Sequence, residues 1–253
     1  MRRVFRERCA CPKTWAGRVQ KALPDHAGFL RLATEFERLG INSAARRTGF
    51  ASYAPHVLVV KAGRTAFPDI WGREKELIAA MSHRKCAYCE TSINAPRGGP
   101  VDHFKPKALF PSLAYDWTNY FLSCPGCNGA KGDKWPKSGG YIRPDRGDPS
   151  RHFIFAEDGT VRAGKAGSAA ARMLDDFDLN GEWLAIDRKT NIDAMLRELE
   201  DASRLYREGN EELARRLATT ILRNVSKPER EFSTALTQCF WRAWKSACPD
   251  VGV

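Results

Sequence analysis

Two Cys-x-x-Cys pairs are the clearest chemical feature of this 253-residue sequence. The four cysteines are Cys86, Cys89, Cys124 and Cys127. Two such pairs can supply four thiolates, which is the ligand set of a closed, tetrahedral structural zinc site. The pairs are 34 residues apart, whereas an ordinary zinc ribbon separates them by about 15–20 residues. We therefore predict a structural Zn²⁺ with room for a catalytic hairpin between its two halves.

An Asp-His pair, Asp102-His103, lies between the cysteine pairs. It follows residues 98–100, Gly-Gly-Pro, and precedes Pro106, which favours a short extended segment. Neighbouring residues on a strand point to opposite faces, so we expect the two side chains to have different roles. A carboxylate that binds a divalent cation, beside an imidazole that takes a proton from water, is sufficient to cut a phosphodiester.

The order and spacing of these motifs resemble the HNH endonuclease superfamily. The motifs are Cys86/Cys89, Asp102-His103-Phe104, Tyr115-Asp116-Trp117-Thr118-Asn119, Cys124/Cys127-Asn128 and Lys131. Within that superfamily the sequence resembles the HNH effector nucleases of Septu-type and retron-associated bacterial anti-phage systems, whose pattern CaYCE, HFxPK, YxWxN, CxxCN and KG is present almost letter for letter. Residues 174–188 also resemble a downstream motif of that family, so the resemblance covers roughly residues 70–200.

The resemblance implies a ββα-metal fold with assigned roles for four residues. His103 would be the general base, and Asp102 and Asn128 would face a catalytic Mg²⁺ or Mn²⁺. Asn119 would brace the loop that carries His103. The third motif position is Asn128, where the superfamily commonly has His; a neutral amide is a weaker ligand, so we expect substrate phosphate to help hold the ion.

The charge balance favours a polyanionic partner. The formal net charge is +11 and the isoelectric point is near 9.4, an excess that is typical of nucleic-acid-binding proteins. Hydrolysis needs positive groups near phosphorus, and Lys107 lies close to the Asp-His pair. We predict that Lys105, Lys131 and Lys134 contact nucleic acid. A merely basic protein without this function remains an alternative.

The compartment follows from what the sequence lacks. No segment approaches the roughly 18 apolar residues of a transmembrane helix, and the basic first residues lack an apolar signal core. We predict a cytoplasmic protein without a membrane partner. In that compartment the eight cysteines are expected to be metal ligands and buried thiols rather than disulfides.

The elements that must position the site fall into three predicted parts. Residues 1–68 are an N-terminal arm and helical lead-in, residues 69–145 are the HNH nuclease core with its zinc site, and residues 146–253 are a β-hairpin and a C-terminal helical region. The predicted fold class is α+β, with a ββα-metal core clipped by a four-cysteine zinc knuckle inside a mainly helical protein.

Periodicity places most of the helices. A helical stripe runs over residues 25–39, with Asp25 near its start and Gly40 as its stop, and a second helix over 69–83 leads into the first cysteine pair. Residues 56–60 form a β-like run. A hairpin is indicated around Asp158-Gly159. The sequence from Gly159 to Lys165 has P-loop spacing, but Ala166 replaces the hydroxyl residue that would hold magnesium, so we predict no nucleotide site.

The C-terminal third is predicted to contain three helices. Two apolar stripes fall at Ile192, Met195, Leu196, Leu199 and Ala202, and at Leu213, Leu217 and Ile221. A capping box at residues 226–229, with proline in the first turn, predicts the start of a third helix. Its apolar face carries Cys239 as a core thiol. Trp241 and Trp244 either anchor an interface or close the core.

Three functions remain open at this point. The favoured one is a metal-dependent endonuclease acting on DNA as the effector of an anti-phage system, and the family resemblance implies an ABC/SMC-like ATPase partner. The available docking surfaces are the segment before Asp25 and the helices after Thr190. One alternative is cleavage of RNA such as tRNA. The other is a zinc-stabilised nucleic-acid-binding module without catalysis.

Overall fold

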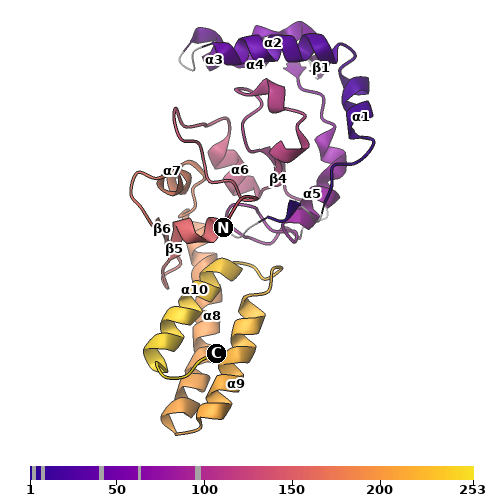
Figure 1. Cartoon of the computed structure of the whole chain (residues 1–253). Coiled ribbons are helices and arrows are strands. Elements are labelled where there is room, and N and C mark those ends of the chain that lie inside the picture. Colours follow the sequence, from indigo (N-terminus) through magenta and orange to yellow (C-terminus); the bar gives the residue numbers. More distant parts are fainter. Residues whose placement is uncertain (2–3, 7–8, 40–42, 62–63, 95–97) are drawn as a thin grey trace.

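Helices and small antiparallel sheets make up the described chain, which agrees with the predicted mixed class. The computed structural model describes residues 1, 4–6, 9–39, 43–61, 64–94 and 98–253. These residues form three separate two-stranded sheets. Figure 1 shows three tiers: the N-terminal helices, a central region with short strands, and a C-terminal helical bundle. None of the helices described here has the length and apolar character needed to cross a membrane.

The N-terminal tier is built on helix α2. Its elements are α1 (Trp15–Ala22), α2 (His26–Arg38), α3 (Ala44–Thr48), α4 (Phe50–Tyr53), η2 (Pro55–Val57), β1 (Val59–Lys61) and β2 (Arg64–Ala66). The helix α2 starts where predicted, because the Asp25 carboxylate accepts a hydrogen bond from the Gly28 amide at 2.9 Å. The predicted stop at Gly40 lies outside the described residues. Only part of the expected β-run at 56–60 is a strand, since η2 takes up its start.

The central region carries the predicted site on very short elements. They are η3 (Trp71–Glu74), α5 (Lys75–Met81), β3 (Val101–His103), η4 (Pro111–Leu113), η5 (Trp117–Asn119), β4 (Tyr120–Leu122) and α6 (Pro125–Lys131). The helix expected over 69–83 is therefore shorter and begins as a 3-10 turn. Strands β3 and β4 pair antiparallel, with Asp102 opposite Phe121 and His103 opposite Tyr120. A hairpin of three-residue strands is not stable alone, so its surroundings must hold it.

The first residues pack into this central region. The Arg6 guanidinium donates to the carbonyl oxygens of Trp117 at 3.1 Å and Tyr120 at 2.9 Å, and it also pairs with Asp145. Val4 is buried. The described residues of this segment are therefore packed against the central region, whereas the sequence predicts an N-terminal arm.

A hairpin and helix α7 join the central region to the bundle. They comprise η6 (Pro149–His152), β5 (Phe153–Phe155), β6 (Val161–Ala163) and α7 (Ala169–Asp176), so the predicted hairpin is confirmed. Gly159 in its turn has φ +83°, and a Cβ there would meet the Ala185 carbonyl oxygen at 2.1 Å. The glycine is thus required for close packing of the turn on helix α8 (Glu182–Arg207).

Three long helices form the C-terminal bundle. Helix α8 (Glu182–Arg207) packs on α9 (Glu211–Val225) and α10 (Ser233–Ala247) (Figure 1). The buried side chains include Ile192, Met195, Leu199, Ala202, Ala214, Ala218, Ile221, Leu236, Cys239 and Phe240. The first stripe and the core thiol are confirmed. Leu213, predicted on the second stripe, is 54% exposed, because the smaller Ala214 and Ala218 form the packed face.

Trp244 is a core residue. It is fully buried, and its indole N–H donates to the Val251 carbonyl at 2.9 Å. The possibility that it anchors an interface is therefore wrong, since no part of it reaches the surface. Trp241 is partly buried against the same core.

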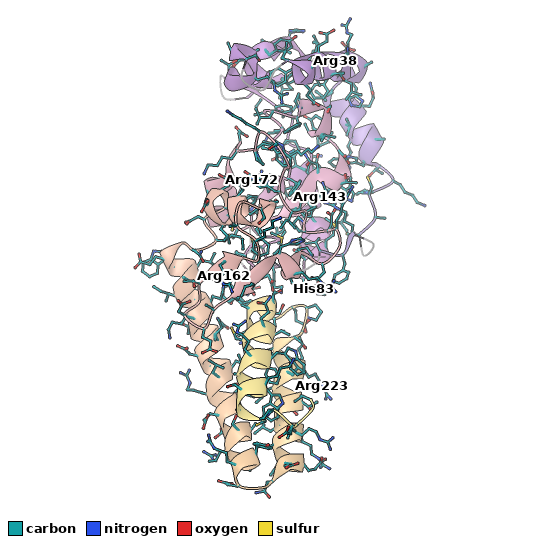
Figure 2. The ribbon with its side chains drawn as sticks, turned by 60° about the vertical axis from the view of Figure 1, so that its left-hand side comes forward. Arg38, His83, Arg143, Arg162, Arg172 and Arg223 are labelled. Atoms are coloured by element: carbon teal, nitrogen blue, oxygen red, sulfur yellow. The ribbon has the colours of Figure 1, made fainter. Side chains whose placement is uncertain are left out.

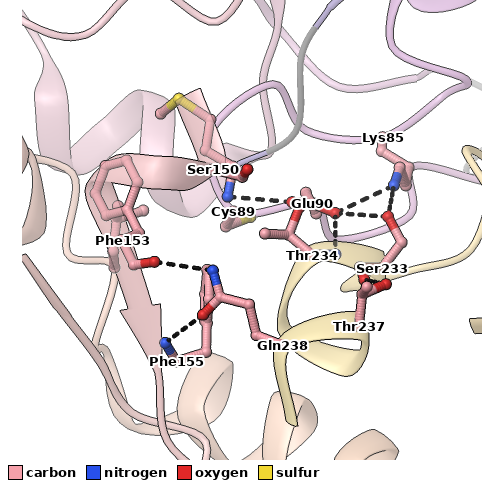
Figure 3. Close-up of polar contacts among 12 residues, drawn as sticks. Lys85, Cys89, Glu90, Ser150, Phe153, Phe155, Ser233, Thr234, Thr237 and Gln238 are labelled. Atoms are coloured by element: carbon pink, nitrogen blue, oxygen red, sulfur yellow. Dashed lines mark hydrogen bonds and ion pairs between the residues drawn. The ribbon is translucent and has the colours of Figure 1, made fainter. Parts of the chain in front are cut away.

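The predicted start of the third helix at residues 226–229 is also wrong. Helix α10 begins at Ser233, because Arg230 before it and the first residues of the helix bond to the cysteine segment. The buried Glu90 carboxylate accepts from Ser233 Oγ at 3.0 Å and from the Thr234 amide at 3.2 Å (Figure 3). Lys85 Nζ lies 3.3 Å from the same carboxylate and donates to the Arg230 carbonyl at 2.8 Å.

A side chain of α10 also fixes the hairpin to the bundle. The Gln238 amide donates to the Phe153 carbonyl at 3.0 Å and accepts from the Phe155 amide at 3.2 Å (Figure 3). Backbone N–H and C=O groups of β5 thereby gain hydrogen-bond partners on α10. The central region and the bundle are thus joined by specific polar contacts.

Candidate active site and metal centre

The four cysteines meet in one cluster. Their sulfur atoms all lie within 4.8 Å of one another, and the cysteines form no disulfide. The Sγ atoms of Cys89 and Cys124 are 3.7 Å apart. A tetrahedral zinc site with Zn–S bonds of about 2.3 Å places its sulfurs about 3.8 Å apart. The donor type, number and spacing therefore fit a metal ion such as zinc.

Local hydrogen bonds place the two halves of this cluster. Cys124 is the N-cap of α6, and its Sγ accepts from the Cys127 amide at 3.4 Å. The turn that starts at Cys86 is tied to the neighbouring strand, because the Ala87 amide donates to the Leu122 carbonyl of β4 at 2.9 Å. Since β4 pairs with β3, the cysteine cluster and the Asp-His strand are held in one unit.

Asp102 is buried and held by two donors from different elements. Lys131 Nζ, at the end of α6, lies 2.8 Å from Asp102 Oδ1 and 2.8 Å from the His103 carbonyl oxygen. The Tyr88 hydroxyl donates to Asp102 Oδ2. A carboxylate has about four acceptor sites, so these two bonds leave it able to take a further ligand.

His103 is buried on the other side of the strand. Its Nε2 lies 3.0 Å from the Ala114 carbonyl oxygen. A carbonyl only accepts, so Nε2 carries the proton and Nδ1 is the acceptor of the neutral ring. Burial, aided by the ammonium of Lys107 and opposed by the Ala114 carbonyl, lowers the pKa of His103 to about 3. The imidazole is therefore neutral at physiological pH.

Asn119 connects the segments on either side of the hairpin. Its Oδ1 accepts from the Lys105 amide at 2.9 Å, and its Nδ2 donates to the Lys105 carbonyl at 3.0 Å and to the Leu113 carbonyl at 3.1 Å. The side chain is buried. It therefore holds the backbone that follows His103 in a single arrangement.

Asp102, His103 and Asn128 share one cavity. Its volume is about 170 Å³, and its lining is Val101, Asp102, His103, Pro106, Lys107, Asn128, Lys131, Gly132 and Asp133. Carboxylate and amide oxygens are ligands that Mg²⁺ and Mn²⁺ accept. The donor set of Asp102 and Asn128 therefore fits such an ion.

The three predicted nucleic-acid lysines lie in three different environments. Lys131 is 1% exposed and paired with Asp102. Lys105 places its Nζ 5.2 Å from the centroid of the Phe110 ring, away from the cavity lining. Lys134 is exposed and lies 4.0 Å from Asp176.

Sequence patterns missed the contacts of Tyr88 and Trp71. Tyr88 is fully buried and supplies the second donor to Asp102. The Trp71 ring meets the His103 ring edge-on, with centroids 4.5 Å apart. The position of Tyr88 inside the first Cys-x-x-Cys pair is the one signal that could have identified it, because a metal-fixed turn orients its middle residues. No comparable signal marks Trp71.

Basic side chains are spread over the whole molecule. Figure 2 shows Arg38 in the N-terminal tier, Arg143 and Arg172 in the middle, and Arg223 on the bundle. Several of them have structural partners; Arg172, for example, donates to the Gly140 carbonyl at 3.3 Å. Charge alone therefore marks no single track for a nucleic-acid strand.

Two curated relatives resemble parts of this chain. One is the Septu protein PtuB of Bacillus thuringiensis, which is 37% identical over 88 residues, 34% of each chain. The other is the Septu protein PtuB of Bacillus mycoides (strain KBAB4), which is 24% identical over 144 residues, 45% of this chain and 49% of the relative. The matches thus span about a third to a half of these relatives. No protein-family model matches the chain. The predicted resemblance to Septu proteins is confirmed over 34% of this chain for the first relative and 45% for the second.

Proposed function

We propose that this chain is a metal-dependent endonuclease of the HNH type that hydrolyses phosphodiester bonds in nucleic acid, with DNA as the favoured substrate. The observation that carries the proposal is the shared cavity of Asp102, His103 and Asn128 beside the cysteine cluster. In this proposal β3, β4 and α6 are the ββα-metal core, and the four cysteines hold a structural Zn²⁺.

The proposed reaction assigns one task to each side chain. His103 Nδ1 takes a proton from a water molecule whose oxygen forms the new bond to phosphorus. The P–O3′ bond breaks, its electron pair stays on O3′, and that oxygen takes a proton from solvent. A Mg²⁺ or Mn²⁺ ion held by Asp102 and Asn128 would stabilise the leaving oxygen. Asn119 keeps the loop after His103 in place.

The burial of the Asp-His pair supports this proposal over simple packing. A buried carboxylate and a buried neutral imidazole are costly to place in a small region, and such groups gather at functional sites. Cleavage of RNA such as tRNA stays as the alternative substrate, since the proposed site acts on a phosphodiester and the described residues include no base-reading element beside it.

The biological setting is part of the same proposal. Similarity to two Septu proteins supports an effector role in a Septu-type anti-phage system. The chain would then work with an ABC/SMC-like ATPase docked on the N-terminal segment or on the helices after Thr190. Co-expression with an adjacently encoded ATPase, followed by purification on a tag carried by the ATPase alone, tests this part separately from catalysis.

Cleavage is tested by incubating the purified protein with plasmid DNA and, separately, total RNA in Mg²⁺ or Mn²⁺, with EDTA as a control. The His103→Ala variant should lose roughly 10²–10⁴-fold in rate because it lacks the base, with zinc content and nucleic-acid affinity kept. The matched control is His152→Ala, since His152 is an exposed histidine outside the cavity. Binding without any cleavage by the wild type would favour the non-catalytic module instead.

A further inference from the structure

One lysine differs from its neighbours in where its ammonium lies. Lys107 lines the cavity together with Asp102, His103 and Asn128. Lys105, two residues earlier, directs its Nζ to within 5.2 Å of the Phe110 ring centroid and 5.8 Å of that of Trp135. The turn after His103 therefore sends two nearby lysines to different places, and only Lys107 faces the proposed chemistry.

Aromatic side chains fix the position of Lys107. Its Nζ lies 5.1 Å from the ring centroid of Trp71 and 6.0 Å from that of Phe67. A cation over an aromatic face is attracted by the ring, more strongly where water is excluded. Trp71 also meets His103 edge-on. The same indole therefore contacts both the imidazole and the ammonium.

The charge of Lys107 is not neutralised by a direct ion pair. Among the described residues no carboxylate oxygen lies within 4.0 Å of its Nζ, whereas Lys131 has Asp102 at 2.8 Å and Lys134 has Asp176 at 4.0 Å. Asp133, Asp102 and Asp69 attract it only at longer range. A partly buried cation without a contacting anion is costly. Such a group, facing a cavity, is suited to an anionic ligand.

We propose that Lys107 is a further catalytic residue, which binds a non-bridging oxygen of the phosphodiester being cut and stabilises the negative charge that grows there during cleavage. This rests on the proposed nuclease function. Lys107 keeps its three protons throughout, because His103 takes the proton of the attacking water. The role of Lys131 is different: its ammonium is occupied by Asp102 and positions that carboxylate.

The test compares Lys107→Met, Lys107→Arg and the control Lys165→Met, at an exposed lysine outside the cavity, on a labelled DNA duplex in saturating Mg²⁺. Lys107→Met keeps the alkyl stem over Trp71 but removes the charge. Its single-turnover rate at saturating protein should fall roughly 10²–10³-fold. Affinity for an uncleavable phosphorothioate duplex should change by less than about threefold. Lys107→Arg should cut faster than Lys107→Met, and Lys165→Met should match the wild type.

Two results would overturn the role of Lys107 without touching the nuclease proposal. One is a Lys107→Met variant that cuts at the wild-type rate. The other is a variant that only binds the duplex more weakly and has an unchanged rate at saturation, which would make Lys107 a simple binding contact. Zinc content and melting temperature equal to those of the wild type confirm that a slow variant is folded. Failure of the wild type to cut at all would reject the nuclease function itself.

Discussion

The central region and the C-terminal bundle place their charges in opposite ways. In the central region the Lys131–Asp102 ion pair has side chains that are only 1% and 5% exposed. On the bundle the Lys189–Asp193 pair is 49% and 38% exposed. The core of the bundle is mostly aliphatic and aromatic, with one buried guanidinium, that of Arg188, at the end of α8 that meets the hairpin. The core beside β3 holds a carboxylate, an ammonium and an imidazole.

This difference shows that the free-energy cost of burying the charged groups of the site falls on the central region. Buried ionic groups lose their hydration, and their attraction repays this only with good geometry. The strands that carry them are three residues long and contribute little stability of their own. The cysteine cluster lies where it can compensate for both deficits, and the bundle has no need of it.

The largest effect is expected from disruption of the cysteine cluster, which only the central region contains. Cys127→Ser should lose zinc and unfold the central region, because it removes part of a metal-coupled folding free energy on the order of 10 kcal/mol. The bundle should stay helical. Elemental analysis measures the zinc, and far-ultraviolet circular dichroism follows the helices. Near-ultraviolet dichroism follows the aromatic side chains, most of which lie outside the bundle.

The matched control for this change is Cys11→Ser, because Cys11 is exposed and outside the cluster. It should leave zinc and both spectra unchanged. A zinc-free Cys127→Ser protein with a wild-type near-ultraviolet spectrum would show that the central region does not depend on the metal.

The next effect concerns the buried ion pair. Lys131→Met should lower the free energy of unfolding of the central region by about 3–5 kcal/mol, because it leaves the buried Asp102 carboxylate without its cation. Lys134→Met, three residues on and exposed, should cost less than about 1 kcal/mol. Urea unfolding followed by tryptophan fluorescence measures both.

A double variant sharpens this prediction. If the cost of Lys131→Met comes from an unpaired charge, adding Asp102→Asn should restore part of the lost stability. A double variant as unstable as the sum of the two single changes would mean that packing, and not charge, is responsible.

Local spacing predicted the parts of the site that neighbours in sequence determine. Three features follow from residues that are close together in the sequence. They are the two Cys-x-x-Cys pairs, the proline-bounded segment of Asp102-His103 and the helical stripe of α2. Spacing also predicted that Asp102 and His103 would have different environments, as the structure has them.

The missed features depend on packing between distant segments. Lys131 meets Asp102 across 29 positions; the motif includes Lys131, but its pairing with that carboxylate depends on the placement of α6. The capping box at residues 226–229 is a valid local pattern, but bonds from Lys85 and Glu90 to the start of α10 determine where that helix begins. The pattern HFxPK includes Lys107 and not Lys105, but only the aromatic rings around the two ammonium groups show that Lys107 lies at the cavity.

A smaller effect is expected from Tyr88. Tyr88→Phe keeps the ring contact with Phe177, whose centroid lies 4.5 Å away, but removes the hydroxyl that donates to Asp102. The free energy of unfolding should fall by about 1.5–3 kcal/mol, the range for hydrogen bonds to charged groups. Zinc content should not change. The control is Tyr141→Phe, whose hydroxyl donates to Asp176 at 2.7 Å; it should cost less, because the Asp176 side chain is 30% exposed and water can replace the donor.

The smallest effect is expected on the bundle surface. Asp193→Asn removes the exposed partner of Lys189, four residues earlier on α8. Pairs of this kind contribute about 0.3–0.5 kcal/mol, so the free energy of unfolding of the bundle should fall by no more than that. Raising the salt from low to physiological ionic strength should remove most of this difference, since exposed charges are screened. The cost of Lys131→Met should persist in the same salt series, because solvent ions do not reach a buried pair. Equal salt sensitivity at both sites would contradict the proposed difference between the two regions. The central region would then not hold its ion pair out of reach of solvent ions, as its burial implies.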